Sequence, residues 1–184
     1  MTEARLTELE PGDSELIRRW RGGDERAATL LVERHAPAVA RFVSSLGEWE
    51  ELDELVQDTF VRAFASLDGF RAESSLRTWL FTIARNLCRD RRRTARWRRQ
   101  QVEIVEDHAV TEHDALDSAV AEETEGRLFQ AVTRLSPMQR EVFTLRVADG
   151  MSYKEIAAVL DTTEGAARVH YHNAMRALKE LLDD

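Results

Sequence analysis

Apolar positions recur at three- and four-residue steps along most of the chain, which is the spacing of one face of an α-helix. The longest such pattern begins at Leu76, and a second, strongly two-faced one runs from about Glu51 to Leu67. The apolar face of the first pattern comprises Leu76, Trp79, Leu80, Ile83, Ala84 and Leu87. No stretch alternates strictly at every second residue for long enough to form a sheet. The pattern therefore predicts an all-α protein.

Capping residues and glycines divide the first fifty residues into three expected helices. Asp13 or Ser14 is expected to cap the first helix and Asp24 the second, because short polar side chains accept hydrogen bonds from exposed backbone amides. Pro37 fits the first turn of a third helix, which Gly47 closes.

Strong helix signals return from about Glu125. Ser136 precedes a first-turn proline, and a capping box begins at Ser152. A turn at Asp161 and a cap at Thr163 then separate a short helix from a longer final one. A short helix, a tight turn and a longer helix are typical of a helix-turn-helix. Glycine is common at the position of Asp161, but Asp tolerates the left-handed turn conformation better than most residues.

Charge is distributed unevenly over the 184 residues, whose formal net charge is -8. Residues 91–101 hold six arginines and no acid, and residues 102–126 hold nine acids and no Lys or Arg. Helical periodicity fades over residues 101–123, which indicates a linker or a segment ordered only on binding. We therefore expect two small helical domains joined by an acidic linker, with the divisions 13–95, 96–124 and 125–184.

The basic segment carries the main functional signal. Eight arginines and one acid lie between Arg85 and Arg99, and such local basicity in an acidic protein indicates a polyanionic partner. The aromatic residues Phe70, Trp79 and Trp97 lie in or beside it, and aromatics with arginines suit unstacked bases. The alternative is a solvated basic helix next to a core tryptophan, and the spacing of Trp79 favours the core for that residue.

Several function classes lack any support in the sequence. A single cysteine, Cys88, excludes an internal disulfide and a multi-cysteine metal site. His108 and His113 lie among acids without a rigid frame, so we expect them to be solvated rather than to bind metal. No phosphate loop, nucleophile motif or paired metal-ligand motif occurs, which favours a binding protein without cofactor over an enzyme.

No apolar run reaches membrane-spanning length and the N-terminus is polar, so we expect a cytoplasmic protein without membrane insertion.

Three segments resemble a known family. FRAESSLRTWLFTIARNLCRDRRR, residues 70–93, resembles the promoter-melting segment of the extracytoplasmic-function (ECF) sigma factors, which are small two-domain bacterial proteins. DELVQDTFVRAF, residues 53–64, resembles their polymerase-binding helix. SPMQREVFTLRVADGMSYKEIA, residues 136–157, resembles their promoter-recognition domain. The resemblance covers about residues 13–95 and 125–182.

The resemblance implies a sigma factor that binds core RNA polymerase and directs promoter-specific initiation. The implied polymerase contacts are Asp53, Gln57 and Asp58. The implied −10 contacts are Phe70, Arg71, Arg85, Asn86, Arg89 and Arg92. Simpler interpretations stay open at this point: solubility for the acids, a helix-surface amide for Asn86, and a core plug under the loop for Phe70. The family also implies an anti-sigma factor as a further partner.

The last helix would lie in the major groove of the −35 element, where residues near its N-terminal end reach base edges. The expected −35 contacts are Lys154, Thr163, Glu164, Gly165, Arg168 and His172. Arg168 is the predicted base contact, because arginine bonds guanine bidentately. The helix departs from the family's basic pattern at Val169, His170 and Asn173. The alternatives are a helix-turn-helix repressor or activator with a helical sensing or dimerisation domain, and a helical adaptor, against which the arginines argue.

Overall fold

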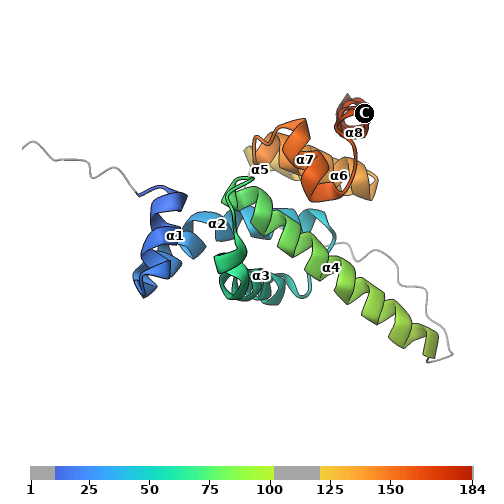
Figure 1. The fold of residues 1–184 in the computed structure, drawn as a ribbon. Helices are drawn as coiled ribbons and strands as arrows, with labels where there is room; N and C mark the ends of the chain where they lie inside the picture. Colours follow the sequence, from blue (N-terminus) through green and yellow to red (C-terminus); the bar gives the residue numbers. More distant parts are fainter. Residues whose placement is uncertain (1–10, 102–120, 184) are drawn as a thin grey trace, which may run out of the picture.

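The computed structural model describes residues 11–101 and 121–183, and within these ranges the chain is helical with no strand (Figure 1). The all-α prediction is therefore confirmed. None of the described helices is both long and apolar enough to cross a membrane. The helices are α1 (Asp13–Arg21), α2 (Glu25–Ser45), α3 (Leu52–Ser66), the short 3₁₀ helix η1 (Leu67–Gly69), α4 (Leu76–Gln101), α5 (Ala121–Thr133), α6 (Pro137–Phe143), the π-helical segment η2 (Thr144–Ala148), α7 (Tyr153–Leu160) and α8 (Glu164–Asp183).

Helices α1 to α4 form a first group, the N-terminal bundle, in which α2 packs against the other three and α3 packs along α4. The rings of Phe42 and Phe81 are fully buried with their centroids 5.0 Å apart, and removing such a side chain from water contributes about 1.5–3 kcal/mol. The C-terminal part of α4 extends away from the packed helices (Figure 1). The arginine-rich end of α4 is thereby presented at the edge of the molecule.

Two sequence-based expectations at the start of this bundle are wrong. Pro37 does not begin a helix but lies inside α2, on its exposed side. Proline removes one amide from the helix interior, and at an exposed position water can bond the carbonyl that loses its partner. Asp13 does not cap α1, whose N-cap is Gly12. Its carboxylate instead accepts hydrogen bonds from Arg34 (2.8 Å) and from the ring of His35 (2.9 Å), which fastens α1 to α2.

Helices α5 to α8 form the C-terminal bundle, in which the predicted caps are confirmed. Ser136 begins α6 and Ser152 begins α7, each in a capping box. Asp161 ends α7 in the left-handed conformation, with φ 49° and ψ 52°. Helix α5 begins at Ala121, four residues before the expected start, and the expected helix after Ser136 passes into the π-helical segment η2.

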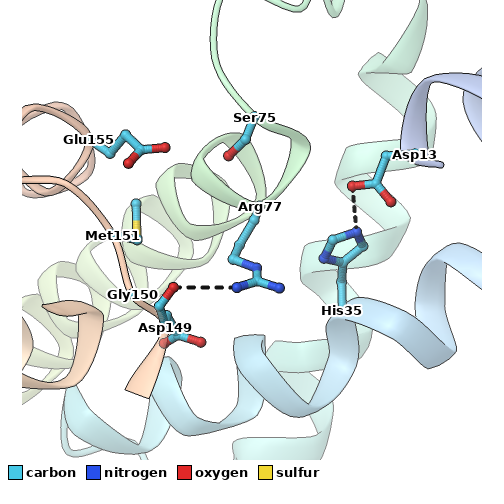
Figure 2. Close-up of a pocket in the computed structure, with 8 residues that line it drawn as sticks. All are labelled: Asp13, His35, Ser75, Arg77, Asp149, Gly150, Met151 and Glu155. Carbon is cyan, nitrogen blue, oxygen red and sulfur yellow. Dashed lines mark hydrogen bonds and ion pairs between the residues drawn. The ribbon is translucent and has the colours of Figure 1, made fainter. Parts of the chain in front are cut away.

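The two bundles are in contact, and one apolar cluster contains buried residues of both. A second, smaller cluster of Ala131, Leu135, Ala174 and Leu178 lies within the C-terminal bundle. Helix α7 lies against the first half of α4, and α6 lies against α2 (Figure 1). Arg41 Nη2 lies 3.0 Å from Asp149 Oδ1, and Arg140 Nε donates to the carbonyl of Ser45 at 2.7 Å. A small open pocket at this junction is lined by residues of both bundles, and the Arg77 side chain crosses it to donate to the carbonyl of Asp149 (Figure 2).

Two carboxylates at the junction are buried against arginine. The side chain of Asp149 is fully buried, and burial raises its pKa although Arg41 opposes the shift. Burial likewise raises the pKa of Glu141, whose carboxylate lies 3.9 Å from Arg85 of α4. Both carboxyl groups therefore bind a proton more readily in the folded chain than in the unfolded one.

Candidate nucleic-acid interface

The loop between η1 and α4 is held close to the bundle. Arg21 of α1 donates to the carbonyls of Leu67 (2.7 Å) and Phe70 (3.3 Å). The Phe70 ring packs on the core with its centroid 5.0 Å from that of Trp79. Both rings are half-buried and pack against the core, as the alternative interpretation of Phe70 and Trp79 expected. Part of the Phe70 side chain stays accessible to solvent. Arg71, next in the chain, is exposed.

Ser75 starts α4 by accepting a hydrogen bond from the backbone amide of Thr78 (3.1 Å). Ten residues later, α4 presents a mixed polar face. Asn86 and Arg89 are exposed, and no hydrogen bond or ion pair engages either side chain within the described residues. Asn86 and Arg89 are thus available to contact an external ligand.

Two other arginines of α4 are engaged by acids of the same bundle. Arg91 contacts Glu51 and Glu54, each at 2.7 Å. Arg92 contacts Glu48 at 2.6 Å and also bonds the carbonyl of Leu46. These pairs connect α4 to the loop between α2 and α3 and to the start of α3. The side chains of residues 96–101, which include Trp97, lie outside the described side chains.

Helix α3 presents the predicted acidic face. Asp53 and Gln57 are exposed, and within the described part of the chain neither side chain takes part in a hydrogen bond or an ion pair. Asp58 is half-buried and acts electrostatically on Arg91. The acids near the start of α3 therefore have two different roles. Glu51 and Glu54 form ion pairs with Arg91 of α4, whereas the Asp53 side chain faces solvent.

The helix-turn-helix consists of α7, the turn at Asp161 and α8. Thr163 Oγ1 accepts from the amide of Ala166 (3.1 Å), which confirms the expected cap of α8. Beyond this cap, the side chain of Arg168 is 59% exposed and its Nη2 donates to Glu164 Oε1 at 2.5 Å. The remaining predicted −35 contacts, Lys154, Thr163, Gly165 and His172, are also exposed. All six residues are thus exposed, at the start of α7, at the cap of α8 and in the first half of α8.

Tyr153 was absent from the predicted contacts, yet it lies next to Arg168. The guanidinium carbons of Arg146 and Arg168 each lie 4.8 Å from the centroid of its ring. The three residues are 7 and 15 positions apart, so no local pattern could have shown this contact.

Two family models match the chain. Sigma-70 region 2 matches residues 31–98, and Sigma-70, region 4 matches residues 125–178. The ECF RNA polymerase sigma-E factors of Salmonella typhimurium and Escherichia coli (strain K12) are each 32% identical over 176 residues, covering 90% of this chain and 92% of theirs. The chain belongs to the ECF RNA polymerase sigma factors. Members of this family are non-catalytic regulators of transcription.

Two solved structures are similar to this one. The sigma factor RpoE from Bartonella quintana, solved in complex with the anti-sigma factor NepR, has a TM-score of 0.69 at 32% identity and covers 87% of this chain and 97% of that one. CnrH, solved in complex with the cytosolic domain of CnrY, has a TM-score of 0.66 at 32% identity, with coverage of 93% and 97%. In this sigma factor, the region 2 match begins within α2 at residue 31 and ends within α4 at residue 98, so it includes all of α3. Helix α1 lies before the matched region.

Proposed function

We propose that this sigma factor binds core RNA polymerase, recognises −35 and −10 promoter elements, and helps to melt the −10 region. The observation that carries the proposal is that one chain presents two separate surfaces with exposed side chains suited to bind DNA. Asn86 and Arg89 lie on α4, and Arg168 lies on α8. A repressor or activator would need only the helix-turn-helix, and it would give no role to the exposed face of α3. We assign residues 13–95 to polymerase binding and −10 recognition, 96–124 to the linker, and 125–184 to −35 recognition.

The polymerase contact is assigned to α3, which carries the exposed Asp53 and Gln57 and the half-buried Asp58. A carboxylate that is desolvated against a partner's arginine can anchor a complex, whereas a pair at the rim contributes little. Asp53 and Gln57 are surplus to the packing of the bundle, which supports a role toward an external surface.

The −10 contact is assigned to α4 and the loop that precedes it. An opened strand exposes bases that must be held by stacking and by polar contacts. Phe70 offers a half-buried ring beside Trp79, and Asn86 offers an amide that can bond a base edge. Arg71 and Arg89 are placed for phosphates, while Arg85 and Arg92 would have to leave their present acidic neighbours to bind DNA.

The −35 contact is assigned to the exposed surface of α8. Arg168 is the base contact, since its guanidinium has five N–H donors and only one is engaged by Glu164. Glu164, Gly165 and His172 line the same surface, and Lys154 and Thr163 lie nearer to the backbone phosphates.

Promoter binding requires the two bundles to separate. The −10 and −35 elements lie about 25 base pairs apart by their positions, which is roughly 80 Å of duplex. In the structure, α7 touches α4 directly and Arg85 of the −10 surface lies beside Glu141 of α6. A conformation that reaches both elements at once therefore lacks these contacts.

An anti-sigma factor is the third partner that we propose, because the similar RpoE structure was solved with one. Copurification from the native cell tests the anti-sigma factor, and recovery of polymerase alone under all growth conditions would contradict it.

The acidic linker would lie in a basic channel of the polymerase. Residues 102–120, which make up most of this linker, are outside the described part of the chain.

Run-off transcription with core polymerase tests the proposed function. Core enzyme alone should give no specific transcript, and adding the chain should give transcripts from a defined set of promoters in a genomic fragment library. Binding of the chain to promoter DNA without any effect on initiation would favour the repressor alternative.

A further inference from the structure

The ring of Tyr153 is fixed at the first position of α7. The capping box holds the backbone at this point, with Glu155 Oε2 accepting from the amide of Ser152 at 2.8 Å. The ring packs on the apolar cluster and meets Tyr171 of α8 edge-on, with centroids 6.0 Å apart. Tyr153 is therefore a rigid element at the junction of the two helices of the helix-turn-helix.

Two guanidinium groups lie over this ring, each with its central carbon 4.8 Å from the centroid. Arg146 is also held by its backbone contact, because its Nη1 donates to the carbonyl of Met151 at 2.7 Å. Arg168 has no backbone contact within the described residues, and its only other partner is Glu164. Tyr153 and Glu164 together are what orients the Arg168 guanidinium.

An exposed arginine on a helix samples many rotamers, and fixing one rotamer on a base costs side-chain entropy. A cation–π contact at an exposed site contributes about 0.5–1 kcal/mol, and it also sets the plane of the guanidinium. Bidentate bonding of guanine depends on that plane, because two parallel donors must meet two acceptors on the base edge.

We infer that Tyr153 is a positioning residue for −35 recognition: its ring holds the Arg168 guanidinium in the orientation that discriminates one base pair. The inference rests on the proposed function, in which Arg168 contacts a −35 base. Tyr153 itself touches no base in this scheme. Its ring reduces the side-chain entropy that Arg168 loses when it bonds one base pair of the −35 element. The base preference at the other positions of the element does not depend on Tyr153.

The test uses the full chain assembled with core polymerase and a pool of duplex promoter fragments randomised across the −35 element. Sequencing of bound and unbound fragments gives a base preference at every position. Arg168→Ala should first identify the position that depends on this arginine. At that position alone, Tyr153→Leu should reduce the preference for the best base by about two- to fivefold, which is the range of one exposed cation–π contact. Tyr153→Phe, which keeps the ring, should retain the wild-type preference.

Three controls separate positioning from a structural role. Tyr153→Met fills the site without a ring and should behave as Tyr153→Leu does, so loss of folding in one variant leaves the other. Adding Tyr153→Leu to Arg168→Ala should cause no further loss at the identified position. Arg146→Met removes the other cation from the ring and should leave the preference intact.

A uniform loss at all positions in Tyr153→Leu, or an equal loss in Tyr153→Phe or Arg146→Met, would overturn the inference and indicate that the ring only supports the fold. An unchanged preference in Tyr153→Leu, together with a clear effect of Arg168→Ala, would overturn the inference and leave the −35 assignment standing. No effect of Arg168→Ala would overturn both, while specific transcription in the run-off assay would still support the sigma-factor function.

Discussion

Arg91 and Arg92 of α4 and Arg168 of α8 differ in what holds them. Arg91 and Arg92 of α4 contact glutamates that lie 37 or more positions earlier in the chain. Arg168 of α8 contacts Glu164, four positions earlier on the same helix. The long-range pairs join α4 to its bundle, whereas the local pair leaves the guanidinium at the surface of the recognition helix.

A run of arginines therefore overstates the number of cations available to DNA. Among the described α4 arginines from Arg85 to Arg93, Arg89 alone is engaged by no hydrogen bond or ion pair. The same distinction holds for the acids of α3, where Glu54 holds Arg91 and Asp53 faces solvent only. Substitutions of engaged charges should change stability, and substitutions of the others should change binding.

Among the substitutions that compare engaged with unengaged charges, the largest effect is expected on the acidic face of α3. Asp53→Arg combined with Gln57→Ala should weaken binding to core polymerase by tenfold or more, about 1.4 kcal/mol, because a reversed charge would oppose a basic partner surface. Competition for core enzyme against the wild-type chain measures this, with the helical circular dichroism unchanged. The matched control is Glu54→Gln, which should lower stability and leave affinity within about twofold. Equal affinity of the double variant and the wild type would remove α3 from the polymerase interface.

A smaller effect is expected on the free energy of unfolding. Arg91→Ala should reduce it by about 1 kcal/mol, because the side chain contacts two glutamates and is only 30% exposed. Arg89→Ala should change it by less than about 0.5 kcal/mol. Urea unfolding of the full chain provides the comparison. Similar losses in the two variants would show that the engaged and the unengaged arginines do not differ.

The salt dependence of DNA binding should show the opposite order. Arg89→Ala should lower the slope of log K against log salt by about 1, since one phosphate contact is lost. Arg91→Ala should leave that slope nearly unchanged. The measurement is binding of the polymerase complex to a promoter fragment with a pre-melted −10 region at several salt concentrations. A larger change of slope in Arg91→Ala than in Arg89→Ala would contradict the assignment.

The smallest effect concerns pH and the attachment of α1. Burial lowers the pKa of His35 below its usual 6.5, although Asp13 opposes the shift. Since the unfolded chain then takes up the proton first, stability is full above pH 6.5 and declines as pH falls from 6.5 to the lowered pKa. In His35→Gln, this part of the decline should vanish in unfolding curves measured across that window. Identical pH profiles in the two proteins would show that His35 does not titrate differently on folding.

Local features of the fold could be predicted from the sequence because their signals are local. Asp24 caps α2, Ser152 caps α7, and Asp161 ends α7 with a positive φ, each through a short-range preference of that residue type. The prediction that Pro37 begins a helix was wrong, because a proline on the exposed face of a helix is tolerated where water replaces the lost hydrogen bond. The π-helical segment from Thr144 to Ala148 has no recognised sequence signal.

The candidate site could be predicted only as a set of residue types. The exposed positions of Asn86, Arg89 and Arg168 follow from helical spacing, and they were predicted. The engagement of Arg92 by Glu48 and the position of Tyr153 under Arg168 depend on how distant helices pack, which no local pattern contains. The contact of α7 with α4 is likewise a property of the folded chain alone.

The division of function between α8 and α4 is tested most directly by one binding measurement on two templates. Polymerase carrying Arg168→Ala or Asn86→Ala is bound to a duplex promoter fragment and to a fragment with a mismatched −10 region and no −35 element. Arg168→Ala should lose about 1–3 kcal/mol of discrimination at one −35 base pair on the duplex and very little on the mismatched fragment. Asn86→Ala should weaken binding to the mismatched fragment and leave −35 discrimination intact. The same profile for both variants on both templates would contradict separate roles for the two helices.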